Sequence, residues 1–555
     1  MREKMNRILN GDKKMDLGTS SFAQLIRNQR LYVDKTKFIE NFLQNGNSVQ
    51  LIVRQRRLGK SLNLDMLRCF LTDLEDYREL FHGLYIENRE IMKLAHSAPV
   101  FLFDFKNLNV NSYQWDIVDQ IDRKLQEYLP KEGVPQRFRR SYERMLEHPE
   151  TFTNGFLLLT EIVYHITKKR SYLLIDEYDK LITNQYDKAK YEEIKQYEAD
   201  LFSAGLKGNI YLEKALITGV MRISRESFLS GLNNIQTYDI FDDAVYTDDF
   251  GLCEEEVDAL HQYFAFDKPE LKKWYNGIRV YNRDIYNIYS VLSYLNYGKY
   301  DNYWGRSGTL DVIINLLNDT RREALMKLLN GEMLKTVIDK RMSFRELLSG
   351  AGDDQFYSLL VQSGYISLEE DLGNDRWMVK IPGRELMNVW KNFILSIVIR
   401  EHPNVLTVFD HIEHLPTFDQ DMTHFLSDRM SFYDIDLKEQ ERAYHIFVLG
   451  LLSGYEDIRY HKPLSNRESG DGRYDILFER AEYCVIFEFK AVKEKKHMEK
   501  AAQDALQQIE EKRYYADVPR GKRVMKSAVV FCGKQCIVRS ANCNNAAIDI
   551  YYNKT

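Results

Sequence analysis

The sequence predicts an α/β protein of several domains. Three observations predict it: a short apolar strand that runs into Gly59-Lys60-Ser61 and a helix, a continuous apolar run that ends in Asp176 and Glu177, and a strand pair that carries Asp475 and Glu488. The chain has 555 residues, of which 44% are hydrophobic and 29% charged. A chain of this length is expected to form roughly three or four domains, each with its own core.

The first of these features is a strand, a loop and a helix in direct succession. Residues 48–53 are an apolar strand, 54–61 are the loop, and 62–71 have helical character. This order is typical of a P-loop, in which backbone amides at the helix start hold phosphate. Lys60 would reach the β- and γ-phosphates of ATP, and the Ser61 hydroxyl would bind Mg²⁺. Taken alone the motif is weak, because Arg54 occupies the place of its first glycine.

The residues expected to surround the phosphates also include four other loop and helix-start positions. These are Arg57, Leu58, Gly59 and Leu62.

A second buried strand strengthens the P-loop interpretation. Residues 171–175 are continuously apolar except for Ser171, as expected for a parallel strand that is covered on both faces. Asp176 would hold Mg²⁺ through water, and Glu177 would polarise the attacking water. The alternative is an acidic loop at a strand end, which the order and spacing of the two motifs disfavour.

A third strand, residues 214–220, places Thr218 where a γ-phosphate sensor is expected. Beyond it, Arg222 and Arg225 are candidate phosphate contacts or arginine fingers.

The C-terminal region carries a pattern that suits phosphodiester hydrolysis. Successive side chains of a strand point to opposite faces, so Glu488 and Lys490 share a face and Phe489 points away. Asp475, on the preceding strand, would meet them across a hairpin whose turn is 479–482. Two carboxylates, with the backbone carbonyl of Phe489, would hold Mg²⁺ or Mn²⁺, while Lys490 orients the nucleophile. The alternative is an ordinary solvated ion pair; Asp471 between two glycines is interpreted as a turn residue.

These positions together resemble a family of bacterial proteins in which an AAA-ATPase-like domain precedes a PD-(D/E)xK nuclease domain. Asp475 and Glu488-Phe489-Lys490 look like the nuclease core. The segments that look like the ATPase-like domain are 18–22, 32–36, 56–61, 175–179, 218–224 and 274–277. The resemblance covers nearly the whole chain.

The resemblance implies a P-loop NTPase parallel sheet with a helical lid and a C-terminal α/β restriction-endonuclease-like domain. It implies that Glu441, before the helical run 444–452, supports the metal ligands or binds a second metal ion. It also implies that a helix within 501–515 flanks the site, with Gln507 or Gln508 facing inward. In the family an arginine at the position of Arg54 is usual, whereas Gln55 replaces the more common proline, which changes loop stiffness and not chemistry.

The region between the two sites is expected to be helical. Residues 254–295 suggest lid-like helices, and residues 343–381 read as helix, helix and hairpin, which is a winged-helix outline. Its second helix holds almost no basic residues, so a rigid spacer or interaction module is at least as well supported as DNA binding. The expected domains are 1–285, 286–430 and 431–555.

Charge and composition limit the partners. A net charge of −6 argues against a uniformly basic nucleic-acid surface, so binding would depend on local patches such as 493–497 and 520–523. For each patch a solvated charged face is favoured over nucleic-acid binding, which their position beside the nuclease-like residues keeps open. No apolar run reaches membrane-spanning length and 1–14 lacks a signal-peptide core, so a cytoplasmic protein without a membrane partner is expected. Among the six cysteines, Cys532, Cys536 and Cys543 cluster; packing thiols are favoured over a zinc site.

Two functions follow as hypotheses. The first is an enzyme that binds and hydrolyses ATP and thereby controls a metal-dependent nuclease, with DNA favoured over RNA as the substrate. The second is a nucleotide-dependent nucleic-acid-binding or sensor protein whose nuclease-like domain does not cut. The intact set of Asp475, Glu488 and Lys490 favours the first. The oligomeric state stays open, because an arginine finger can come from the same chain or from a second copy.

Overall fold

The computed structural model describes most of the chain and divides it into two compact units. It describes residues 8–183, 187–222, 234–241, 243–306, 313, 316–329, 331–340, 342, 352–401, 414–429, 448, 464–469, 471–479, 482–516, 518, 521–533 and 535–543. The first unit comprises Met1–Ser307 and Lys335–Leu386, and the second Gly308–Leu334 and Met387–Thr555. The three expected domain boundaries remain a prediction.

The first unit is built on a five-stranded parallel sheet. Its strands are β3 (Val49–Val53), β4 (Val100–Asp104), β5 (Ser171–Asp176), β6 (Leu212–Gly219) and β7 (Ile235–Tyr238). They are ordered β4-β5-β6-β3-β7, and each neighbouring pair is parallel. Every residue of β3 and β5 is buried, which confirms that these apolar runs are central strands. The P-loop strand β3 and the acidic strand β5 are not adjacent, because β6 lies between them.

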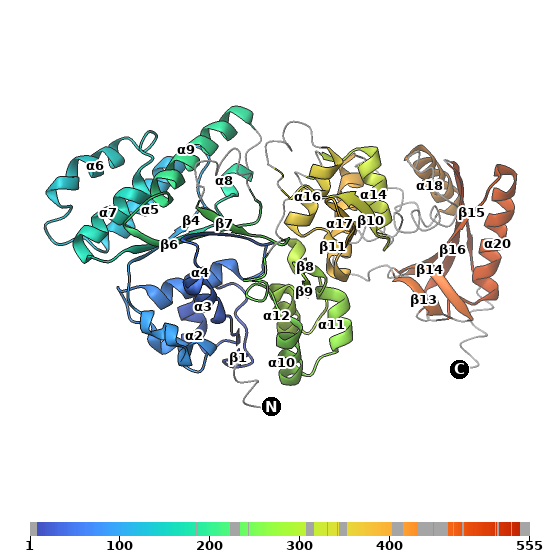
Figure 1. Cartoon of the computed structure of the whole chain (residues 1–555). Helices are drawn as coiled ribbons and strands as arrows, with labels where there is room; N and C mark the ends of the chain where they lie inside the picture. Colours follow the sequence, from blue (N-terminus) through green and yellow to red (C-terminus); the bar gives the residue numbers. More distant parts are fainter. Residues whose placement is uncertain are drawn as a thin grey trace. The chain divides into compact units, whose positions relative to one another are not determined.

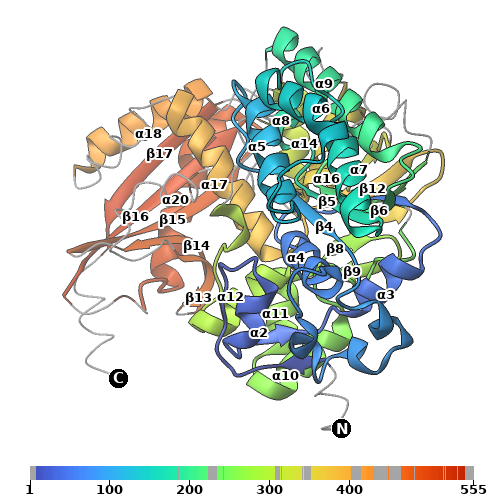
Figure 2. The same ribbon diagram turned by 90° about the vertical axis from the view of Figure 1, so that its left-hand side faces the viewer.

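Helices cover both faces of this sheet. They are α2 (Phe22–Arg27), α3 (Lys37–Gln44), α4 (Lys60–Leu71), α5 (Tyr113–Gln126), α6 (Gln136–Glu147), α7 (Gly155–Thr167), α8 (Lys180–Thr183) and α9 (Lys188–Leu206). Figure 1 shows α5, α7 and α9 on one face and α3 and α4 on the other, and Figure 2 shows the same layers after a quarter turn. The sheet is therefore sandwiched, as parallel sheets require.

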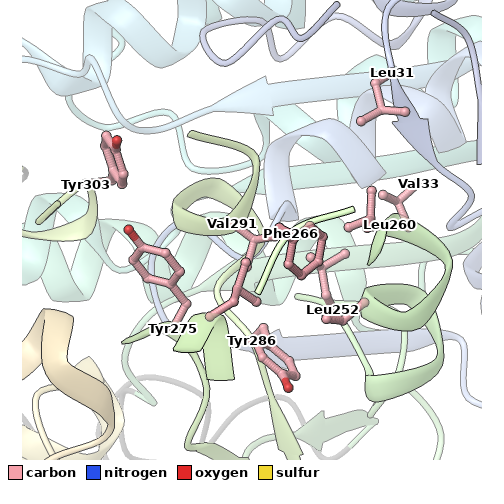
Figure 3. Close-up of a cluster of buried hydrophobic side chains, with 11 residues drawn as sticks. Leu31, Val33, Leu252, Leu260, Phe266, Tyr275, Tyr286, Val291 and Tyr303 are labelled. Carbon is pink, nitrogen blue, oxygen red and sulfur yellow. The ribbon is translucent and has the colours of Figure 1, made fainter. Parts of the chain in front are cut away.

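Three further helices form the expected lid. They are α10 (Glu254–Phe264), α11 (Lys268–Tyr275) and α12 (Ile288–Tyr297), and a hairpin of β8 (Ile278–Val280) and β9 (Arg283–Ile285) lies between α11 and α12 in the chain. Their apolar faces share one core with β2 (Tyr32–Val33), which pairs with β1 (Leu9–Asn10). Figure 3 shows Leu31 and Val33 in the same cluster as Leu252, Leu260 and Phe266 of the lid. A buried ion pair of 2.6 Å between Lys35 and Glu256 adds a charged contact between the two regions.

The middle region contains a helix and a hairpin close to the predicted outline. Helix α16 (Asp353–Ser363) precedes β11 (Ser367–Asp371) and β12 (Arg376–Lys380), and β10 (Leu334–Val337) completes a three-stranded sheet in the order β10-β12-β11. The hairpin predicted around Gly373-Asn374 is confirmed, because β11 and β12 pair antiparallel. The other predicted helix, 343–348, lies outside the described residues. In the chain, α14 (Asp319–Leu329) precedes these elements and α17 (Gly383–Glu401) follows them.

The second unit contains a mixed five-stranded sheet. Its strands, in spatial order, are β13 (Leu464–Ser469), β14 (Gly472–Glu479), β15 (Tyr483–Ala491), β16 (Arg523–Cys532) and β17 (Gln535–Asn542). Only β15 and β16 pair in parallel, and α20 (Met498–Glu511) connects them, as a parallel pair requires a crossover. Helix α18 (Leu415–Arg429) packs on the edge strand β17. None of the helices in the described ranges is both long enough and apolar enough to span a membrane.

Candidate active sites

The P-loop begins at the carboxyl end of β3 and wraps around Lys60. Gly59, with φ of 91°, takes the left-handed conformation that glycine allows and precedes α4 directly. The Lys60 side chain is buried, and its Nζ donates to the carbonyls of Arg54 at 2.9 Å and Gln55 at 2.8 Å. Burial lowers the pKa of Lys60. The Lys60 ammonium is thus bound by two carbonyl oxygens at the start of its own loop.

Arg54, in the place of the first P-loop glycine, has a structural role. Its side chain is fully buried, pairs with the carboxylate of Asp243 and donates to the carbonyls of Val53 and Tyr238. Its guanidinium also lies over the ring of Phe250. The buried Arg54 side chain therefore fixes the start of the loop to the core of the first unit.

Asp176, at the carboxyl end of β5, connects this strand with β6 and with the start of α4. Its Oδ2 accepts a hydrogen bond of 2.5 Å from the Ser61 hydroxyl, and its Oδ1 accepts one of 2.6 Å from the Thr218 hydroxyl. This arrangement follows from the strand order, because β6 carries Thr218 between β3 and β5. Two hydroxyls and a carboxylate are oxygen donors of the kind that Mg²⁺ prefers, so this set fits a magnesium ion beside a bound nucleotide.

Glu177 follows directly and has an unusual backbone. Its φ is 52°, which is rare for a residue with a side chain and is often found at functional sites. Its pKa is raised, first by burial and then by the charge of Asp176. A carboxyl group of this kind is suited to accept a proton from water.

Asp179 is a site residue to which the sequence reasoning assigned no role. Its Oδ2 accepts hydrogen bonds from the backbone amides of Val220 at 3.0 Å and Met221 at 2.7 Å, so it fixes the turn that follows β6. A Cβ at Gly219 would lie 2.7 Å from the Asp179 carboxylate, which explains the glycine. The acidic motif that contains Asp179 was a visible signal, but nothing in the sequence names the two amides as its partners.

The other residues that the sequence predicted to bind nucleotide have separate contacts and burial. Arg222 pairs with Asp239 at 3.2 Å, and Arg225 lies outside the described residues. The Arg57 guanidinium lies 3.9 Å from the ring centre of Tyr289 in the lid helix α12. Leu58 is buried, and Leu62 is half-buried in α4. The structure thus brings Lys60, Ser61, Asp176 and Thr218 together. Arg57 and Arg222 instead contact Tyr289 and Asp239.

The predicted acidic pair and lysine meet at one end of the hairpin of β14 and β15. Ile476 pairs with Phe487 in the antiparallel register, so Asp475 and Glu488, the next residues beyond that pair, lie opposite each other on the two strands. Asp475 Oδ2 accepts a hydrogen bond of 2.9 Å from the Phe489 amide, and Lys490 Nζ lies 2.9 Å from Glu488 Oε1. The two strands therefore bring the three residues together as the sequence suggested.

Glu488 is the most constrained of these groups. It is only 3% exposed, and its pKa is raised to about 7 by burial and by the charge of Asp475. Its Oε1 accepts from Lys490 and, at 2.6 Å, from the amide of Gln508 on α20. Its Oε2 is buried and has no hydrogen-bond partner within the described ranges. An orphaned carboxylate oxygen beside a second carboxylate fits a divalent cation.

The choice between two glutamines is resolved by these contacts. Gln508 bonds Glu488 and the Tyr514 hydroxyl, whereas Gln507 is exposed and bonds only Glu511 among the hydrogen bonds of the described chain. Both had helical spacing that could face the site. The inward residue is Gln508.

Other expectations for this unit have mixed outcomes. Glu441 lies outside the described residues. Over the part of the chain that the structure covers, no three or more His, Cys, Asp or Glu side chains gather into a metal site, and all the cysteines are free thiols. Lys493, Lys495 and Lys496 are exposed just after β15, whereas Lys522 of the second basic segment pairs with Glu479. The first basic segment therefore presents exposed lysines close in sequence to the nuclease-like residues, and one of these lysines, Lys496, pairs with Glu494.

Comparison with known proteins agrees with this architecture. Residues 16–229 match a family model described as predicted AAA-ATPase, and residues 439–541 match a model of the PD-(D/E)XK nuclease superfamily. An uncharacterized protein in the vnfD 5′ region of Azotobacter chroococcum mcd 1 is 26% identical over 525 residues, which covers 90% of this chain and 93% of that protein. The chain therefore carries a domain of the predicted AAA-ATPase family and, towards its C-terminus, a domain of the PD-(D/E)XK nuclease superfamily.

Proposed function

We propose that the protein binds and hydrolyses ATP, and that its nucleotide state controls a metal-dependent nuclease that cleaves DNA. The observation that carries the nuclease part is Glu488, whose buried carboxylate keeps one oxygen without a partner in the described structure while Lys490 and Gln508 hold the other. The ATPase part is supported by Asp176, at the end of β5, which accepts hydrogen bonds from the hydroxyls of Ser61 and Thr218.

In the ATPase, Lys60 exchanges its contacts with two loop carbonyls for the phosphates of ATP. Ser61 and Asp176 would hold Mg²⁺, which neutralises phosphate charge. Glu177 accepts a proton from the attacking water, and its raised pKa makes it a better base than a solvent-exposed glutamate. Thr218 turns its hydroxyl proton from Asp176 to the terminal phosphate, and Arg222 reaches the same phosphate after it leaves Asp239.

In the nuclease, Asp475 and Glu488 would hold Mg²⁺ or Mn²⁺ together with the backbone carbonyl of Phe489. The ion would acidify bound water and neutralise charge on the phosphate. Lys490 orients the nucleophile and stabilises its negative charge. Gln508 fixes the orientation of Glu488, and Phe489 contributes its amide to hold Asp475. The exposed lysines after β15 would contact the backbone of the nucleic acid.

One observation favours a second function, a nucleotide-dependent nucleic-acid-binding or sensor protein. Asp475 and Glu488 form only a pair, and the described residues contain no larger metal-ligand group around them. A pair binds a metal ion more weakly than a larger set. Nucleic acid would then be held without being cut.

The test compares cleavage and ATP hydrolysis in one set of variants. Purified wild type is incubated with linear DNA, circular DNA and RNA, with and without ATP, in Mg²⁺ or Mn²⁺. We expect DNA cleavage that Lys490→Ala lowers by about 100-fold, since a positioned charge in a water-poor site is worth several kcal/mol. Lys500→Ala, which changes an exposed lysine of α20, is the matched control. Binding without cleavage in every condition would select the second function.

A further inference from the structure

The side chain of Gln55 connects the P-loop with the helix of the middle region. Gln55 is buried, and its Nε2 donates a hydrogen bond of 3.1 Å to the carbonyl of Val361 in the last turn of α16. Carbonyls in the last turn of a helix have no partner in a following helical turn. The Val361 carbonyl accepts one hydrogen bond of 3.1 Å from the Gly364 amide, and Gln55 supplies a second donor. Gln55 therefore caps α16 from the nucleotide site, across 306 residues of sequence.

The end of α16 is shaped to receive this glutamine. Gly364 ends the helix with φ of 87°, and a Cβ at this position would lie 2.8 Å from the Cδ of Gln55. Only glycine satisfies both the left-handed backbone and the close approach. Both residues are thus suited to the contact: Gln55 supplies the donor, and Gly364 leaves room for its side chain.

The same residue also meets the P-loop lysine. Lys60 Nζ binds the backbone carbonyl of Gln55 at 2.8 Å, while the Gln55 side chain holds Val361. A phosphate that takes Lys60 must draw it away from this carbonyl. The backbone of Gln55 is then free to turn, and its side chain is carried with it.

A small cavity separates Gln362 of α16 from the arginine beyond the sensor strand. Gln362 is 5% exposed, and neither atom of its amide has a partner in the described structure. It lines a cavity of about 10 Å³ together with Arg222 and Asp239. This volume is that of a single water molecule, so Gln362 is poised beside the Arg222–Asp239 pair without a fixed partner.

We propose that Gln55 is a positioning residue through which α16 holds the P-loop in its nucleotide-free conformation. This inference rests on the proposed binding of ATP. The contact between Gln55 and Val361, called the latch below, competes with phosphate for the conformation of the loop. ATP binding opens the latch, and opening the latch favours ATP binding by the same factor, because the coupling of two equilibria is reciprocal.

The experiment breaks the latch from each side separately. Gln55→Met removes the donor and keeps the length of the side chain. Gly364→Ala acts from α16, outside the P-loop, by pushing against Gln55. Gly373→Ala is the matched control, because Gly373 also has a positive φ of 75° but nothing lies within 4 Å of its added Cβ. The affinity for ATP is measured by calorimetry, and hydrogen exchange of residues 352–366 is measured with and without ATP, after thermal melting shows that each variant is folded.

Both latch variants should bind ATP about 3- to 10-fold more tightly than wild type, which is the worth of one hydrogen bond. Gly373→Ala should bind like wild type. In wild type, ATP should increase exchange in 352–366, and in Gln55→Met exchange should be high already and insensitive to ATP. Unchanged or weaker binding in both latch variants, or exchange that ignores ATP in wild type, overturns the latch alone. A wild type that binds no ATP overturns the proposed function as well.

Discussion

Arg54 shows how a departure from a sequence motif can be a structural necessity. The guanidinium is fully buried with the carboxylate of Asp243, so removal of either partner leaves the other as an uncompensated charge. Arg54→Gly, which restores the usual P-loop glycine, is therefore expected to destabilise the protein by about 3–5 kcal/mol and not to improve ATP binding.

Urea denaturation measures this effect, and a double variant provides its control. Arg54→Met combined with Asp243→Asn removes both charges, so it should recover most of the lost stability. An Arg54→Gly protein with the urea midpoint of wild type would show that the buried pair is dispensable.

Two adjacent glutamines offer a matched test of the nuclease-like site. Gln508 bonds the Glu488 carboxylate at 2.6 Å, whereas Gln507 bonds the exposed Glu511. Gln508→Ala should lower metal affinity or cleavage by about 10- to 100-fold, the usual effect of removing a group that orients a metal ligand. Gln507→Ala should leave both unchanged. Equal effects of the two substitutions on Mn²⁺ affinity, measured by calorimetry, would contradict the assigned role.

For single residues, the sequence predicted their chemical roles better than it predicted the residues that they contact. Lys60, Asp176 and Glu488 could be named because their residue types follow strands and turns at recognisable spacing. Asp243 as the partner of Arg54 and Val361 as the partner of Gln55 could not be named, and Gln508 could not be distinguished from Gln507, since tertiary packing brings each of these contacts together. Local patterns specify what a residue can do; only tertiary packing specifies what it touches.

The edge strand β17 shows that local patterns also leave open which helix packs against which strand. The amides of Val538 and Ser540 point away from β16 and are bonded by the side chains of Thr423 and Asp419 on α18. Side chains four residues apart on a helix are separated by about 6 Å, close to the spacing of two residues on a strand. Helix α18 thus covers an edge that could otherwise pair with another chain.

Glu385, in the first turn of α17, gives a pH dependence to the first unit. It is buried, and its Oε1 accepts hydrogen bonds from Ser290 Oγ at 2.9 Å and from the amides of Tyr303 and Trp304 at 2.8 Å. Burial raises its pKa from 4.5 to about 7. The folded state therefore holds the proton more tightly than the unfolded state, so this group's stabilising contribution is complete below pH 4.5 and is lost as the pH rises through about 7.

Glu385→Gln removes the charge and retains an acceptor oxygen. The pKa difference corresponds to about 3 kcal/mol, so the variant should gain about this amount relative to wild type at pH 8 and less than about 1 kcal/mol at pH 5. Urea titrations of both proteins at the two pH values measure the difference, with the exposed Glu370→Gln as control. A stability difference that is the same at both pH values would exclude titration of Glu385 as its cause.

For the whole molecule, the sequence predicted the fold of each region more fully than the contacts between elements of different regions. The parallel sheet, the lid helices, the α16 hairpin region and the nuclease-like strand pair follow from apolar periodicity and turn residues, which act locally. The hairpin of β8 and β9 was not predicted, because its strands have only three residues each. The docking of α16 onto the P-loop was also absent from the predictions, since one buried glutamine and one glycine carry it.

The last prediction concerns control of the nuclease by ATP. Glu177→Gln should bind ATP without hydrolysing it, and Lys60→Ala should fail to bind, because the glutamate activates water and the lysine supplies phosphate charge. If nucleotide state controls cleavage, these two variants should cut DNA at rates that differ by about fivefold or more, the lower range of measured couplings. Cleavage of a labelled DNA by both variants, with and without ATP, measures the difference.

Reciprocity supplies an independent check that needs no cleavage. In the Lys490→Ala background, where cutting is expected to be slow, DNA should change the affinity of Glu177→Gln for ATP by the same factor by which ATP changes its affinity for DNA, because both report one coupling free energy. Calorimetric titration of ATP in the presence and absence of DNA, followed by the reverse titration, measures the two factors. Equal ATP affinities with and without DNA, together with equal cleavage by the Glu177→Gln and Lys60→Ala proteins, would show that the two sites work independently.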